Sequence, residues 1–156
     1  MFDFEITTDL SAVQAILAHP KLYSLMADDF MPPRELFQVP PPGAITYVLV
    51  KRAGERMGIV LVVRRNQLYC ELHVCILPTF WGWASVKAAR QFFPWFWAHF
   101  SYLRAVGNIP SCNKAALSFA ELCRLERFGT NRGVFQKGGR LYDEVWVGID
   151  RPVMTT

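Results

Sequence analysis

The segment from Leu68 to Leu77 constrains the fold most, because its alternating pattern predicts a strand with two different faces. The apolar face, which suits a core, consists of Leu68, Cys70, Leu72, Val74 and Ile76. The other face begins polar and ends apolar, and consists of Tyr69, Glu71, His73, Cys75 and Leu77. Central strands are usually apolar on both faces, so Glu71 and His73 indicate a cleft where a carboxylate or an imidazole could take a proton.

Each of these polar residues also has a structural interpretation. Glu71 could simply pair with a neighbouring arginine on an exposed sheet face. His73 could be a histidine whose hydrogen bonds are satisfied within the protein. Glu71, His73 and Cys75 share one face of the strand, but no fourth ligand stands out elsewhere in the sequence, so we predict no metal site.

The predicted strand runs directly into the segment from Thr79 to Ser85 and then into a helix. Gly82, Ala84 and Ser85 are small, so ligand phosphates could approach the free backbone N–H groups at the start of the helix. The alternative is that these residues only make a tight entry into the helix.

The remaining chain alternates helical and strand patterns without a repeat or a linker, and we interpret residues 1–156 as one α/β (α+β) domain with a mixed sheet. The predicted elements, in order, are a strand at 2–6, helices at about 9–19 and 21–31, a proline-rich segment to 43, strands at 45–51, 57–63 and 68–77, a helix at 85–100, a strand at 102–107, a helix at 113–125, and a hairpin of 131–135 with 142–149.

The helix predicted at 85–100 has an apolar stripe, made of Val86, Ala89, Phe93, Phe96, Trp97 and Phe100. Trp95 and His99 lie off this stripe and predict an exposed aromatic edge for a partner. At the next helix, Asn113 stands where an N-cap residue is expected.

Charge is distributed unevenly along the chain, which has a net charge of +4. Residues 1–35 form an acidic lobe whose carboxylates are Asp3, Glu5, Asp9, Asp28, Asp29 and Glu35. The basic remainder suits a phosphorylated ligand as well as nucleic acid. No nucleic-acid-binding motif accompanies Lys87, Arg90 and Arg104, so we interpret them as a solvated face and do not expect nucleic acid as a partner.

Compartment and membrane association follow from two further features. The four cysteines lack a CxxC pair, and Cys70 and Cys75 should point to opposite faces of their strand, so we expect reduced thiols. The N-terminus has no secretory pattern, and the most apolar stretch, residues 91–103, is too short to span a bilayer. We therefore expect a cytoplasmic protein without a membrane partner.

Taken together, these segments resemble the GCN5-related N-acetyltransferase superfamily over about the full chain. Its signature, Gln/Arg-x-x-Gly-x-Gly/Ala, is similar to Thr79-x-x-Gly82-x-Ala84, which departs at the first position. Glu71 occupies the place of the general base in histone-type members. Asn113-x-x-Ala116 resembles the helix whose Asn contacts the cofactor, and Arg127-Phe128-Gly129 loosely resembles a following Gly-Phe.

The resemblance implies acetyl-CoA as cofactor, with Glu71 and His73 as the catalytic residues. Its cofactor-binding residues would be Cys75, Leu77, Thr79, Trp81, Gly82, Trp83, Ala84, Ser85 and Asn113. Backbone groups of Cys75 and Leu77 would hold the acetyl carbonyl and the pantetheine arm. Ala120 replaces the tyrosine that commonly protonates the leaving thiolate, which affects turnover more than binding.

The sequence therefore predicts an acetyl-CoA-dependent N-acetyltransferase that transfers an acetyl group to a primary amine of a small molecule or a protein. The alternative is a binding or structural module with this fold that has lost catalysis. Small bacteriophage-encoded members with degenerate motifs also look similar. The acidic lobe hints at a cationic acceptor, and the oligomeric state, a homodimer included, stays open.

Overall fold

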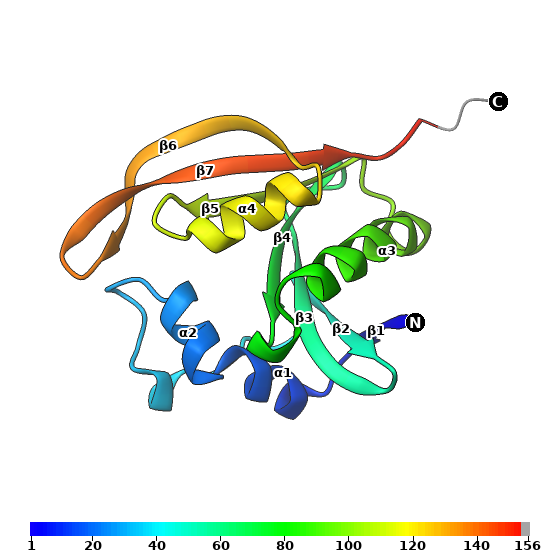
Figure 1. Ribbon diagram of the computed structural model, residues 1–156, viewed down its shortest axis with the longest axis horizontal. Helices are drawn as coiled ribbons and strands as arrows, with labels where there is room; N and C mark the ends of the chain where they lie inside the picture. Colours follow the sequence, from blue (N-terminus) through cyan, green and yellow to red (C-terminus); the bar gives the residue numbers. More distant parts are fainter. Residues whose placement is uncertain (154–156) are drawn as a thin grey trace.

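The computed structural model describes residues 1–153. A sheet of seven strands, in the order β1-β2-β3-β4-β5-β7-β6, forms the middle of the molecule (Figure 1). The strands are β1 (Phe2–Thr7), β2 (Ile45–Arg52), β3 (Glu55–Arg64), β4 (Tyr69–Ile76), β5 (Arg104–Pro110), β6 (Glu126–Lys137) and β7 (Arg140–Asp150). The helices are α1 (Leu10–Leu17), α2 (Pro20–Met26), α3 (Trp83–His99) and α4 (Lys114–Leu122), with short 3₁₀ turns at Arg34–Leu36 and Pro78–Phe80.

The predicted order of elements and the α+β class are confirmed. All neighbouring strands pair antiparallel except β4 and β5, which are parallel because α3 connects them. The N-cap of α1 is Asp9, whose side chain accepts the backbone N–H of Ala12 at 3.0 Å.

Helices cover both faces of the sheet. On one face, Ala88, Phe92 and Phe96 of α3 pack on even-numbered residues of β2, β3 and β4. On the other face, α1 and α2 pack on Tyr47, Leu49 and Ile59, which are odd-numbered residues of β2 and β3. The strands β2 and β3 therefore bury both of their faces.

Parts of two helix predictions were wrong. The second helix ends at Met26 rather than near residue 31, because the Asp28 carboxylate accepts the backbone N–H groups of Phe30 and Met31 and forms a turn there. The α3 helix begins at Trp83, two residues earlier than predicted.

The partner edge predicted on α3 was also wrong at Trp95. Trp95 is partly buried, and its ring lies 5.6 Å from that of Phe4 on β1. His99 is exposed and stacks on Trp95, with ring centroids 4.2 Å apart. The buried stripe runs through Ala88 and Phe92, because the helix turns its face toward β1 and β3.

The structure bears on the expected reduced thiols and on the expected lack of a membrane-spanning helix. All four cysteines lie within the described residues and carry free thiols, as predicted. Among residues 1–153, no helix is both long enough and apolar enough to cross a bilayer.

Candidate active site

The strands β4 and β5 pair over only three residues and then separate. Their ladder runs from Tyr69–Arg104 to Glu71–Val106. Beyond it, β4 continues to Ile76 beside β3, whereas β5 continues to Pro110 beside β7. The separation leaves one side of β4 without a strand partner from Leu72 onward.

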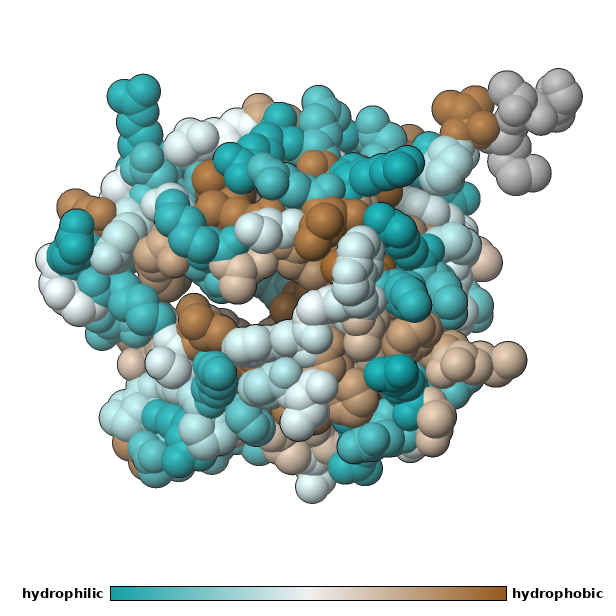
Figure 2. Space-filling view, viewed as in Figure 1, coloured by the Kyte–Doolittle hydropathy of each residue, from teal (hydrophilic) through white to brown (hydrophobic). Residues whose placement is uncertain are grey.

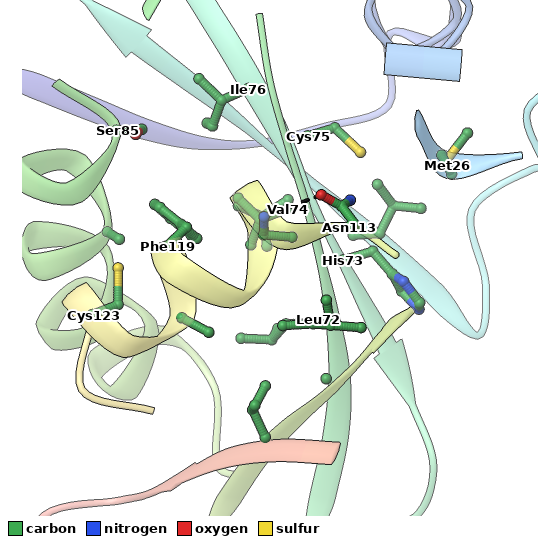
Figure 3. Close-up of a pocket in the computed structure, with 18 of the residues that line it drawn as sticks. Met26, Leu72, His73, Val74, Cys75, Ile76, Ser85, Asn113, Phe119 and Cys123 are labelled. Carbon is green, nitrogen blue, oxygen red and sulfur yellow. Dashed lines mark hydrogen bonds between the residues drawn. The ribbon is translucent and has the colours of Figure 1, made fainter. Parts of the chain in front are cut away.

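A cleft of about 850 Å³ passes through this separation. On one side of β4 it is bounded by the start of α3 and by α4, and on the other side by α1, α2 and the proline-rich segment. The space-filling view shows the cleft as a hollow with apolar residues around it (Figure 2). His73 and Cys75 point to the side where Met26 of α2 lies, whereas Ile76 points to the other side (Figure 3).

Val74 was predicted to lie in the core, but it is 44% exposed. It belongs to the apolar face of β4, and Leu72 on the same face is only partly buried. Both residues line the cleft, because the neighbouring strand has separated from β4 at this level. An apolar face predicted for a core therefore serves partly as a cleft wall.

The strand register decides which backbone groups face the cleft. The Leu77 N–H is donated to the Met57 carbonyl of β3 at 2.9 Å, so odd-numbered residues of β4 direct their N–H groups to β3. The Leu68 carbonyl accepts N–H groups from the β5 side, so even-numbered residues face β5. The backbone roles expected of Cys75 and Leu77 thus do not fit, and Val74 and Ile76 present their N–H groups instead.

The loop after β4 has a conformation that favours glycine. Gly82 has φ +88° and is the N-cap of α3, and a Cβ at this position would meet no atom within 4 Å. The first hydrogen bond within α3 is donated by Val86 to the Gly82 carbonyl. The N–H groups of Trp83, Ala84 and Ser85 precede it and stay available for an anion at the positive end of the helix dipole.

Side chains of the same loop hold its position. Trp81 donates its indole N–H to the Ile76 carbonyl at 2.7 Å, and the Ser85 hydroxyl donates to the Gly82 carbonyl at 2.7 Å. Trp83 and Thr79 are exposed, and their side chains make no such hydrogen bond within residues 1–153. The first turn of α3 contains no acidic residue, so nothing there repels an anion.

Glu71 forms an ion-paired cluster rather than standing free in the cleft. Its side chain is buried, and one carboxylate oxygen accepts two hydrogen bonds from the Arg65 guanidinium. The other oxygen lies 2.9 Å from Nε2 of His73. These hydrogen bonds, led by that of His73, lower the pKa of Glu71 to about 2. Such a carboxylate is a weak base, so the structure favours the ion-pair interpretation of this residue.

His73 is the member of the cluster that reaches the cleft. Its side chain is 38% exposed and lines the cleft wall. Because ionised Glu71 can only accept a hydrogen bond, Nε2 of His73 carries the proton between them. In the neutral imidazole, Nδ1 then holds the lone pair, and among residues 1–153 it has no hydrogen-bond partner. Of the two predicted catalytic side chains, His73 is therefore the one placed to accept a proton.

Asn113 is confirmed as an N-cap, since its side-chain oxygen accepts the Ala116 N–H at 3.1 Å. It also lines the cleft, as Figure 3 shows. Ala120 of the same helix lines the cleft too, and none of the described residues along the cleft is a tyrosine.

Two features of the site were missed by sequence analysis. Arg65 lies in the turn between β3 and β4, six residues before Glu71, and was not named as its partner although pairing with a neighbouring arginine was considered. Asp29 accepts the N–H groups of Gly138 and Gly139 at 2.7 and 2.8 Å, which ties the loop after α2 to the hairpin of β6 and β7. These partners are 109 and 110 residues apart in the sequence, so no local pattern could have indicated the contact.

Solved structures with the same architecture include spermidine N-acetyltransferase from Vibrio cholerae in complex with CoA and spermine. It has a TM-score of 0.75 and 14% identity, covering 96% of this chain and 95% of that one. Mutant forms of the spermidine/spermine N-acetyltransferase from the same organism give a TM-score of 0.73 at 14% identity over 96% and 93%. The chain has the fold of these N-acetyltransferases. No protein-family model and no curated protein sequence matches it.

Within this N-acetyltransferase fold, six of the eleven predicted site residues line one cleft, whereas Glu71, Leu77, Thr79, Trp83 and Ala84 do not line it. The loop from Trp81 to Ser85 borders it at the start of α3, and His73, Cys75 and Asn113 line it farther along. Among residues 1–153, no three His, Cys, Asp or Glu side chains are placed to hold a metal ion.

Proposed function

We propose that this protein is an acetyl-CoA-dependent N-acetyltransferase whose proton acceptor is His73. The observation that carries the proposal is the separation of β4 from β5, which joins the start of α3 to His73 through one continuous cleft. The shared fold with an enzyme crystallised with CoA supports this proposal.

The residues of the cleft fit the chemical groups of acetyl-CoA. The diphosphate would lie at the N–H groups of Trp83, Ala84 and Ser85, where the small residues Gly82, Ala84 and Ser85 and the helix dipole favour an anion. The amide-bearing arm would follow the open side of β4, where Val74 and Ile76 present backbone N–H groups. Bound there, acetyl-CoA would supply an activated acyl group as a thioester.

His73 would remove a proton from the acceptor amine, because an ammonium has no lone pair with which to attack. The proton would go to Nδ1, and Glu71 would hold the ring through Nε2 and stabilise the imidazolium. The N–H of Val74, near the reacting carbonyl, would stabilise the negative oxygen that develops there. Water would protonate the leaving thiolate.

The first experiment is a calorimetric titration of the protein with acetyl-CoA and with CoA, followed by a CoA-release assay. In His73→Gln we expect acetyl-CoA affinity to stay within about twofold and turnover to fall about 10²- to 10⁴-fold. Unchanged turnover in His73→Gln would remove this residue from the mechanism, and absence of acetyl-CoA binding would refute the proposal as a whole.

Glu71→Gln distinguishes a positioning residue from a base. The amide can still accept the Nε2 proton but carries no charge, so we expect a smaller loss of turnover than in His73→Gln and a shifted pH profile. A loss equal to that of His73→Gln, with the pH profile unchanged, would return the base role to Glu71.

The second candidate is a binding module with this fold that no longer catalyses transfer. The observation that favours it is Ala120, which lines the cleft where the resemblance expects a tyrosine to protonate the thiolate. This candidate predicts binding of acetyl-CoA in the titration together with no CoA release in the presence of any amine.

A further inference from the structure

We infer that the acceptor is a monoamine with a bulky apolar body, and not a polyamine. This inference rests on the proposed function, because it concerns the part of the same cleft where the acceptor amine would reach His73. It follows from the side chains that line this part of the cleft and from where the neighbouring carboxylates are engaged.

The part of the cleft on the His73 side, which we term the acceptor chamber, is lined by apolar side chains of α1, α2 and the segment after it. They are Leu17, Leu22, Leu25, Met26, Met31 and Phe37. Covering such side chains with an apolar ligand contributes roughly 25 cal/mol for each Å² removed from water. The chamber therefore favours binding of an acceptor with an aromatic or aliphatic body.

A polyamine would need carboxylates along its length, and the chamber does not provide them. Among the described residues that line the whole cleft, Glu144 is the only acidic one, and its Oε2 accepts the side-chain N–H of Asn108 at 3.1 Å. Lys21, which also lines the cleft, adds a positive charge. Burying several ammonium groups here would be unfavourable because they would lose water without gaining partners.

The acidic N-terminal lobe does not change this conclusion, although the sequence suggested that it would attract a cationic acceptor. Asp9 caps α1, Asp28 accepts backbone N–H groups of its own turn, and Asp29 accepts those of Gly138 and Gly139. Glu5 and Glu35 pair with Lys51 and Arg34. None of the six acids of the lobe lines the cleft.

One nitrogen of the acceptor can be accommodated. His73 is the polar group at the end of the chamber nearest β4, and its Nδ1 can accept a hydrogen bond from an amine. A primary amine on a short linker would reach His73 while its apolar body occupies the chamber between α2 and Phe37. The apolar lining and the single imidazole acceptor thus favour arylalkylamines and long alkylamines.

The test measures amine binding to the full chain in the presence of CoA, so that its result does not depend on turnover. Tryptamine and octylamine are the apolar probes, and spermidine is the polyamine probe. We expect the apolar amines to bind at least about tenfold more tightly than spermidine. Equal or tighter binding of spermidine would overturn the inference.

A pair of variants ties the preference to the chamber. Leu25 is 39% exposed and lines the cleft, so Leu25→Glu should fold and add a carboxylate there. We expect it to weaken tryptamine binding about tenfold and to strengthen spermidine binding. Leu36→Glu is the control, because Leu36 is 70% exposed and does not line the cleft. Equal effects of both substitutions would overturn the assignment of the chamber.

The two levels of proposal fail separately. If acetyl-CoA binds and CoA is released with spermidine in preference to tryptamine, the acceptor class is wrong and the proposed function stands. If acetyl-CoA does not bind in the initial titration, both proposals are overturned.

Discussion

The two halves of β4 have different surroundings although they form one continuous strand. From Tyr69 to Glu71 the strand is paired with β3 on one side and β5 on the other. From Leu72 to Ile76 it is paired with β3 alone, and its second side borders the cleft. We refer to these parts as the closed half and the open half.

Two polar residues on the same face of β4 have different surroundings in the two halves. Glu71, in the closed half, is buried, and its carboxylate contacts Arg65 and His73. His73, only two residues further, is partly exposed and keeps one ring nitrogen for a ligand. A polar residue on a strand is thus accessible to a ligand where the neighbouring strand leaves, because space and unpaired backbone groups appear together there.

The largest effect is expected for a substitution at Gly58 of β3, which pairs with Ile76 of the open half. A Cβ at Gly58 would lie 2.9 Å from Cα of Ile76 and closer still to the Cys75 carbonyl. We therefore expect Gly58→Ala to push the open half away from β3, to cost about 3 kcal/mol of unfolding free energy and to weaken acetyl-CoA binding. Urea unfolding and calorimetry measure the two effects.

Matched substitutions at two other glycines show whether the loss of stability is specific to the open half. A Cβ added at Gly107 of β5 would lie 3.3 Å from the Leu72 carbonyl oxygen, so Gly107→Ala should cost clearly less unfolding free energy. At Gly43 a Cβ meets no atom within 4 Å, and Gly43→Ala should leave stability nearly unchanged. Equal losses in all three variants would contradict the predicted difference.

The second prediction concerns the contribution of the closed half to folding stability at low pH. The hydrogen bonds of His73 and Arg65 hold the pKa of Glu71 at about 2, well below its ordinary value of 4.5. A carboxyl whose pKa is lowered in the folded state stabilises the fold above its unfolded pKa, and this contribution is lost as the pH falls from about 4.5 to about 2.

We expect a loss of about 2 kcal/mol across this range, because water partly screens Arg65 and His73. Urea unfolding measured at several pH values, compared with Glu71→Gln, checks it. The variant should lack this part of the pH dependence. An identical slope in both proteins would show that other carboxyls are responsible.

The third prediction concerns the end of the open half, where a side chain takes the place of a strand. The indole N–H of Trp81 occupies the Ile76 carbonyl, so Trp81→Phe removes one hydrogen bond. We expect a cost of about 1.5 kcal/mol and weaker binding of the CoA diphosphate, since the loop before α3 loses its anchor. Thermal unfolding and CoA titration are the measurements. Trp83→Phe is the control, because Trp83 is 65% exposed.

The smallest effect is expected at Asn113, across the cleft from the open half. Asn113→Ala removes the cap of α4 and should cost about 1 kcal/mol. Asn113→Ser keeps a capping oxygen and so should keep most of the stability. If the Asn113 side chain also binds the pantetheine arm, the serine variant should lose affinity for CoA while staying stable; full affinity would leave Asn113 a cap only.

Local patterns in the sequence were sufficient for the element order and for several contacts within elements. The alternation from Leu68 to Leu77 predicted β4, and the capping role of Asn113 was recognisable because a cap acts over three residues. The glycine at position 82 marked the entry to α3, where the backbone has a positive φ. The end of α2 was missed because a turn centred on Asp28 competed with an apolar helical pattern.

The sequence by itself determined which residues lie on each face of a strand and, to within two residues, where helices begin, because these properties depend on neighbours a few residues away. Only the tertiary structure decided that Val74 borders a cleft and that Asp29 binds the hairpin turn. These outcomes depend on where β5 leaves β4 and on which segments then meet. Such packing is set by contacts between distant parts of the chain, so no periodicity encodes it.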